Sequence, residues 1–508
     1  MKPTPEIAVV ANKTKGSIRA MISKAALNRC KWATLILFVI GYVITVPRLE
    51  EFATEYMLYH AVALCSCALL LALLDFNRSD VPVWLGLVTL LTLYFGRFYL
   101  IVLDHSYLIG FVPYEPFSEF ANKMDSLFEA FRLSVIGFVS FSLSSAFMLA
   151  RLKSSESRKN ASPALEGEVE LTLHRLVPKL VLPILLPLML VLAFLALWFH
   201  IGQMGTAPSE PLPFRLRGVV AYARIVLLPL LILQVICSGE SSGQRSLVWI
   251  GMLLLLSHGV SDALIRSSRS SLLLIALLLV FVVLAGGLEL RRRVVAFACA
   301  VGVSAVALSS GLTAYRILRA RDGEVPVVEA FARAFKSIID RGPSEIMEGV
   351  EFVLIRIPGV DLLWSILSRI QEPLGINSLQ IFSTQNGMAG YLTYTVFASD
   401  STNLTLYAPS FFGWLYLVWG VPAIVIGSIS IAIFSVLAWK YLSAGRWLSG
   451  PVARTFLLWM IFMALGEGNL DGMGFTVLVG VLTIATLEIG LRISLQFIER
   501  RNKLSISG

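Results

Sequence analysis

The residues that could do chemistry in this chain are arginines inside or at the ends of long apolar segments. Arg97 lies within the apolar run Leu93–Tyr99, and Arg224 lies at a similar depth in another. An ionisable side chain inside a membrane costs about 2.5–3.5 kcal/mol on insertion scales, so it marks a functional position by default. The alternative is that each guanidinium reaches the membrane surface along its own stem. Since a guanidinium presents a fork of N–H donors that fits phosphate or carboxylate, these residues predict an anionic ligand.

A second arginine pattern stands at the start of a later apolar segment. Arg266 and Arg269 are three residues apart, so on a helix they share one face. Serines surround them, and the free N–H groups of a helix N-terminus attract anions. The pattern predicts a phosphate site, and the alternative is an ordinary polar turn. Further arginines are expected to serve the same ligand: Arg316, Arg319, Arg341, Arg356 and Arg369.

Two carboxylates are candidates for a general base toward a hydroxyl, Glu348 and Asp361. The alternative for each is a simple ion pair with a nearby arginine. We expect no metal and no cofactor, because no Cys/His spacing suits a metal and the chain has no Walker A, HExxH or GxSxG motif.

The composition shows what must position these residues. Of 508 residues, 56% are hydrophobic and 15% are charged, whereas soluble domains average about 45–50% and about 25%. These values exclude a soluble globule, a disordered chain, a fibre and a disulfide scaffold. We predict an all-α polytopic membrane protein. Twelve spans are expected, at about 32–49, 57–76, 82–103, 131–150, 179–200, 218–238, 246–263, 270–288, 294–314, 411–438, 452–467 and 473–496.

The basic residues predict the orientation of these spans. The net charge is +9. Most Lys and Arg residues fall in the N-terminal tail and in the loops that lie on the same side of the membrane as that tail when twelve spans are counted. Because cytoplasmic loops collect Lys and Arg, we expect both termini in the cytoplasm. The membrane thus accounts for the positive charge, and no nucleic-acid partner is predicted.

One outer loop, 315–410, is far longer than the others. Apolar residues recur at helical spacing around 327–335, 346–357 and 362–370, which predicts three short amphipathic helices on the outer membrane face. Such a loop would act as a lid over a catalytic groove. The predicted regions are a basic tail (1–31), spans one to nine (32–314), the loop (315–410), spans ten to twelve (411–496) and a cytoplasmic tail (497–508).

Three local patterns carry a family resemblance: Ser267–Leu272 at the start of a span, Leu354–Leu363 in the long loop, and Ala408–Gly420 where the loop re-enters the membrane. Together with the plan of many spans and one late outer loop, they resemble the bacterial O-antigen polymerase (Wzy) and oligosaccharide repeat-unit polymerase family. The third pattern departs from the family at Trp414, where an acidic residue is expected, so no catalytic role is carried over to that position.

The resemblance implies a GT-C-like, metal-independent glycosyltransferase at the periplasmic face of the bacterial inner membrane. Its donor would be a glycan on undecaprenyl pyrophosphate, and its acceptor the next lipid-linked repeat unit. In this reading Arg97, Arg266, Arg269 and Arg316 bind the pyrophosphates, and Arg341, Arg356 and Arg369 close over them from the loop. The lipid bilayer is the medium, and a chain-length regulator and a flippase are further candidate partners.

Two other functions stay open. One is an O-antigen ligase or another polyprenyl-linked glycan transferase. A ligase uses the same donor, but such ligases are expected to carry a histidine in the large outer loop, and 315–410 contains none. A twelve-span transporter or flippase is the alternative of another class. Transporters of the major facilitator type carry their longest loop in the middle of the chain, whereas here it follows the ninth predicted span.

Overall fold

The computed structural model describes residues 24–75, 80–103, 124–156, 167–201, 216–266, 270–307, 359–370, 372–382, 387–396, 408–443, 447–468 and 470–506, with 329, 332, 336, 339, 340 and 342 as single positions. Within these residues every regular element is a helix and none is a strand. The chain is therefore all-α, as the composition predicted.

The outer surface of the helices is apolar. In the described part of the chain, nine helical segments are long and apolar enough to cross a membrane, and two shorter apolar helices accompany them. Leu37, Phe147 and Trp198 expose most of their side chains. Exposed apolar area on this scale is unfavourable in water, but hydrocarbon is its natural surrounding. The protein is thus a polytopic membrane protein.

Each of the twelve apolar segments read from the sequence overlaps a helix within the described residues, nine of the helical segments are long enough to span a membrane, and residues 308–314 of the ninth predicted span lie outside the described part. One predicted span differs in detail. The predicted span 411–438 is two helices, α21 (Phe411–Trp419) and α22 (Val421–Ser443). Gly420 between them has a φ of +67°, a left-handed conformation that ends a helix, and Pro422 starts the next one. The re-entry of the long loop is therefore a bent segment.

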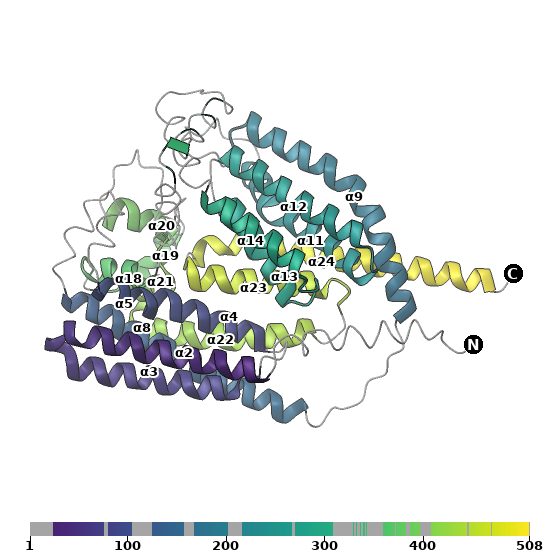
Figure 1. Ribbon diagram of the computed structural model, residues 1–508. Helices are drawn as coiled ribbons and strands as arrows, with labels where there is room; N and C mark the ends of the chain where they lie inside the picture. Colours follow the sequence, from purple (N-terminus) through teal and green to yellow (C-terminus); the bar gives the residue numbers. More distant parts are fainter. Residues whose placement is uncertain are drawn as a thin grey trace.

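One group of helices lies side by side across the lower half of Figure 1. Its members are α2 (Lys24–Thr45), α3 (Ala53–Leu73), α4 (Val81–Leu90), α8 (Met124–Glu156) and α22. Aromatic rings fill the space between them, with Phe38 on Phe95 at a centroid distance of 4.9 Å and Phe98 on Phe131 at 4.4 Å.

A second group runs obliquely across the upper half of Figure 1. It contains α9 (Gly167–Trp198), α11 (Leu228–Ser241), α12 (Arg245–Arg266), α13 (Ser270–Leu284) and α14 (Arg292–Ala307). Helices α23 (Gly450–Gly466) and α24 (Leu470–Ile506) join the groups, because α23 packs on both α4 and α13, and α24 packs on α9.

We call the end of the bundle where α5 (Arg97–Leu103) and α12 end, and where α8 and α13 begin, the loop end. Helices α5, α18 (Val360–Leu367) and α21 lie there, at the left of Figure 1, whereas α2 begins and α24 ends at the right. The remaining described elements of the long loop are η7 (Gly375–Asn377), α19 (Ser378–Phe382), α20 (Gly387–Gly390) and η8 (Tyr391–Val396).

The amphipathic helices expected in the long loop have mixed outcomes. The first two, around 327–335 and 346–357, fall largely or wholly outside the described residues. The third corresponds to α18, and its expected place on the membrane face is wrong, since residues 360–366 are all buried. Helix α18 packs against α8 and α5. The apolar spacing predicted one buried face of this helix. It did not show that Asp361, on the polar face, would also be buried through its ion pair with Arg97.

Candidate functional site

The first polar cluster at the loop end joins two segments that are 264 positions apart in the sequence. The Nη1 atom of Arg97 donates to Oδ1 of Asp361 at 2.8 Å, and the two side chains are only 7% and 6% exposed. Arg97 begins α5, six residues before its end at Leu103, and Asp361 lies in the first turn of α18. The pair therefore fixes the long loop to the membrane bundle.

The backbone at Gly359 sets the position of this pair. Its N–H donates to the same Asp361 Oδ1 at 3.0 Å. A Cβ atom on Gly359 would lie 2.2 Å from the carbonyl oxygen of Leu93, which is less than any normal contact. Only glycine lets the loop approach the helix this closely. Part of the loop pattern Leu354–Leu363 thus has a structural task, which is to dock α18.

The second polar cluster joins α12 and α13 to the turn between α10 (Leu216–Tyr222) and α11. Arg224 Nη2 lies 2.6 Å from Oδ1 of Asp262, and Arg266 Nη1 lies 3.4 Å from Oδ2 of the same carboxylate. The hydroxyl of Ser271, in the first turn of α13, donates to Asp262 Oδ2 at 2.6 Å. His258 Nε2 is 2.9 Å from the carbonyl oxygen of Arg224.

Within the part of the chain that the structure describes, this second cluster has an excess of positive charge. Two guanidiniums share one carboxylate, and Arg266, with a side chain that is 23% exposed, is the more accessible of the two. It lies at the end of α12 beside the N-terminus of α13, where backbone N–H groups add a partial positive charge. The arrangement can receive a phosphate or another anion.

Three of the four described candidate arginines, Arg97, Arg224 and Arg369, are associated with a π-helical turn. Turn η4 (Leu91–Gly96) directly precedes Arg97, and turn η6 (Ala223–Leu227) contains Arg224. In η8, the carbonyl of the last residue, Val396, accepts a bond of 2.6 Å from Arg369 Nη1. Such turns insert one residue into a helix and are frequent at functional sites. Nothing in the sequence indicated them.

Sequence reasoning missed a third carboxylate at the loop end. Asp471 lies in the first turn of α24. Its Oδ2 accepts the N–H of Met388 at 2.8 Å, and its Oδ1 accepts the indole N–H of Trp414 at 2.9 Å. The signal that could have found it is the glycine-rich acidic turn between two apolar segments, Gly466–Gly474.

Ring contacts connect the three clusters across the loop end. Tyr94, in η4, packs on Phe412 at a centroid distance of 4.3 Å and accepts that residue's N–H. Phe475, one turn beyond Asp471, stacks on Tyr222 at 5.7 Å, directly before η6. The two arginine clusters and Asp471 therefore belong to one continuous region of packed helix ends.

The structure describes five of the residues predicted as site residues. Arg97 and Asp361 meet each other, Arg224 and Arg266 meet through Asp262, and Arg369 bonds to the backbone of η8. The others lie outside the described residues: Arg269, Arg316, Arg319, Arg341, Glu348 and Arg356. Among the residues described, no group of three or more His, Cys, Asp or Glu side chains is placed to hold a metal ion.

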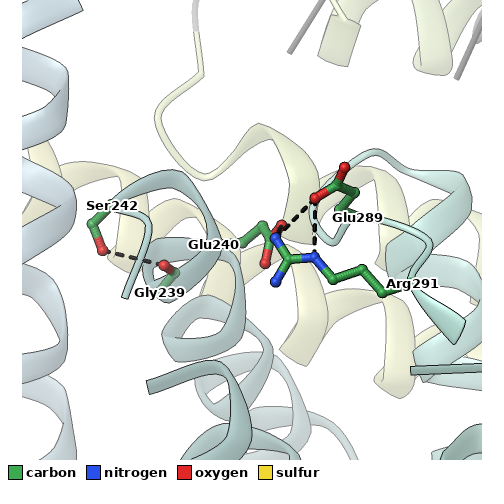
Figure 2. A network of polar contacts seen from close by, with 5 residues as sticks. All are labelled: Gly239, Glu240, Ser242, Glu289 and Arg291. Carbon is green, nitrogen blue, oxygen red and sulfur yellow. Dashed lines mark hydrogen bonds and ion pairs between the residues drawn. The ribbon is translucent and has the colours of Figure 1, made fainter. Parts of the chain in front are cut away.

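Ion pairs at the opposite end of the bundle have a different character. Figure 2 shows Arg291 between Glu240, at 2.7 Å, and Glu289, at 2.8 Å. Arg291 and Glu289 are both half-exposed, and the network joins the end of α11 to the short link between α13 and α14. Pairs of this kind connect neighbouring segments and contribute little to stability.

Comparisons with known proteins identify no relative of this chain. The chain matches no family model, no curated protein and no solved structure.

Proposed function

We propose that this chain is a polysaccharide polymerase of the O-antigen or repeat-unit type. It would transfer the growing glycan from undecaprenyl pyrophosphate to the next lipid-linked repeat unit. The observation that carries the proposal is the second polar cluster, in which Arg224 and Arg266 share the single carboxylate of Asp262 beside the N-terminus of α13. The resemblance in Ser267–Leu272 falls at the same place in the chain.

The chemistry of the reaction explains why that charge balance is useful. When the bond between sugar and phosphate breaks, negative charge grows on the departing pyrophosphate. Fixed donors that are already in place stabilise this charge, and one such donor is typically worth about 3–4 kcal/mol in a transition state. In the proposal Asp262 and Ser271 hold the arginines in position, and Arg266 presents its fork to the phosphate.

The first cluster has a positioning role in this proposal. In the conformation described, the Asp361 carboxylate is engaged by Arg97 and by the N–H of Gly359. A buried ion pair of this kind suits a positioning role, because it links α5 to α18. We therefore assign Arg97 and Asp361 to docking α18, and with it the long loop, over the loop end.

The membrane arrangement follows the same proposal. Twelve spans with both termini in the cytoplasm would put the loop end at the periplasmic face of a bacterial inner membrane. There a GT-C-like enzyme would meet lipid-linked substrates that have already crossed the membrane. The exposed apolar flanks of the helices provide surface for the polyprenyl tails.

Gel analysis of surface and lipid-linked polysaccharide from a deletion strain tests the proposal. We expect the polymer ladder to disappear, with a single capped repeat unit remaining, and the intact gene to restore the ladder. Long lipid-linked polymer with none attached to the core would identify a ligase instead. An unchanged ladder in the deletion strain would contradict both glycan functions and would favour transport.

A further inference from the structure

Asp471 differs from Asp361 and Asp262, the two buried carboxylates of the arginine clusters at the loop end. Asp361 and Asp262 are each engaged by arginine. Asp471 accepts two N–H groups, and among the described residues no Lys, Arg or His lies within ion-pair distance of it. A carboxylate has about four acceptor positions, so two remain for a ligand. The residue is half-buried, which leaves it accessible.

The backbone around Asp471 is built to hold it. Gly387 has a φ of +53°, and a Cβ there would lie 1.9 Å from Asp471 Oδ2. Gly468, three residues before Asp471, has a φ of +65°, and its Cβ would lie 2.0 Å from the carbonyl carbon of Ser410. At both positions the conformation and the lack of space each require glycine.

Ser410 adds backbone strain at the same place. Its φ of 61° and ψ of 159° belong to a region that is nearly restricted to glycine. Backbone strain of this kind concentrates at functional sites. Ser410 caps α21, the helix that carries Trp414, by accepting the N–H of Gly413. The strain therefore sets the orientation of the helix that delivers the indole to Asp471.

The surroundings of Asp471 suit a sugar. Trp414 stacks on Phe382 at a centroid distance of 5.3 Å and an interplanar angle of 7°, and both rings are half-buried. An aromatic ring packs against the C–H face of a pyranose, and a carboxylate accepts its hydroxyls. One turn along α24, Phe475 packs on Tyr222, which directly precedes the turn that carries Arg224.

We propose that Asp471, with the Trp414–Phe382 pair, forms the acceptor-sugar subsite, and that Asp471 is the general base of the transfer. This inference rests on the proposed function. The acceptor hydroxyl gives its proton to the Asp471 carboxylate, and its oxygen forms the new bond to the anomeric carbon of the donor. The bond from that carbon to the phosphate oxygen breaks, and its electron pair leaves with the pyrophosphate beside Arg224 and Arg266.

A double-variant experiment separates this role from a structural one. Asp471→Asn alone would turn an amide N–H toward the N–H of either Met388 or Trp414. A loss of activity in this variant could therefore come from a local structural change or from the loss of the base. Trp414→Phe removes the indole donor, and in the double variant the amide group of Asn can occupy that place without a conflict. The three variants and the wild type are compared for polymerisation of the lipid-linked repeat unit isolated from the deletion strain.

For purified enzymes in nanodiscs we expect Trp414→Phe to raise KM and to lower kcat in part, because Trp414 belongs to the proposed subsite. The double variant should recover the melting temperature of Trp414→Phe, while its kcat stays at least about 100-fold lower, the usual contribution of a general base. Recovery of kcat in the double variant to the level of Trp414→Phe would overturn the assignment, because Asp471 would then serve only to hold Trp414.

The wild-type gene distinguishes the two failures. If it does not restore the ladder in the deletion strain, the proposed function is wrong, and the assignment of Asp471 falls with it. If the wild type polymerises the repeat unit and the double variant does so equally well, the proposed function stands and only the role of Asp471 is wrong.

Discussion

The two arginine clusters at the loop end differ in their charge balance. Arg97 and Asp361 form an ion pair in which both side chains are almost fully buried. Arg224 and Arg266 share the carboxylate of Asp262, and Arg266 keeps part of its side chain exposed. Among the described residues, the second cluster thus has two guanidiniums for one carboxylate, and one of them is accessible. In the proposed function, the first cluster positions the loop and the second binds the anion.

The largest effect is expected from breaking the ion pair between Arg97 and Asp361. Asp361→Ala removes the carboxylate that pairs with the buried Arg97 guanidinium, which should cost about 3–5 kcal/mol of unfolding free energy. The double variant Arg97→Met with Asp361→Leu should recover much of that loss, because well-packed apolar residues can replace a buried ion pair. SDS-induced unfolding of the purified variants measures both values. Losses that simply add in the double variant would contradict this ion pair.

The second cluster should show the opposite separation of stability and activity. Arg266→Met leaves Arg224 and Asp262 as a balanced pair, so we expect the unfolding free energy to change by less than about 1 kcal/mol. Polymerisation should fall at least about 100-fold, because a preorganised donor is lost. Arg266→Lys should fail almost as badly, since Lys lacks the bidentate fork. Full activity of the Lys variant would remove Arg266 from the site.

A smaller effect is expected from the docking glycine. Gly359→Ala places a methyl group against the backbone of Leu93 and should cost about 1–3 kcal/mol, the range of core overpacking. Activity should fall as well, because α18 would be displaced. Gly302→Ala in α14 is the matched control, since its Cβ would meet only the Cβ of Ala276, at 3.9 Å. Equal melting temperatures for the two variants would show that the loop does not dock as described.

The smallest effect is expected at the opposite end of the bundle. Arg291→Ala removes the half-exposed network of Figure 2, and exposed pairs contribute about 0–1 kcal/mol. We expect an unchanged ladder in cells and a melting temperature close to that of the wild type. A loss of polymer in this variant would show that removing a charge at either end of the bundle affects activity. The activity losses expected at the loop end would then be no evidence for a binding site there.

The apolar segments and the depth of the arginines were predictable from the sequence. A run of about 20 apolar residues can be stable only as a helix in hydrocarbon, so the segment order follows from local composition. The same reasoning marked Arg97 and Arg224 as costly and hence functional candidates. The break at Gly420 also had a local signal, a glycine two residues before a proline, but the segment's high hydropathy concealed it.

The partners of the arginines could not be predicted in the same way. Asp262 is buried because it meets Arg224 from a different helix, and Asp361 is buried because Arg97 lies inside the bundle. Ion pairs between distant segments depend on how helices pack, and hydrophobic spacing carries no record of that packing. Asp471 was missed for the same reason, since its importance arises from Met388 and Trp414, which the fold brings to it.

The sequence by itself determined that this protein is a bundle of membrane helices with arginines at costly depths, because hydrophobic length and ionisable cost are properties of each segment alone. The tertiary structure alone decided which carboxylate each arginine meets and which arginine stays partly exposed, and it alone produced the π turns beside Arg97 and Arg224. Those outcomes depend on distances between segments that are far apart in the chain. The packing of helix ends sets these distances, and they in turn set the electrostatics of the site.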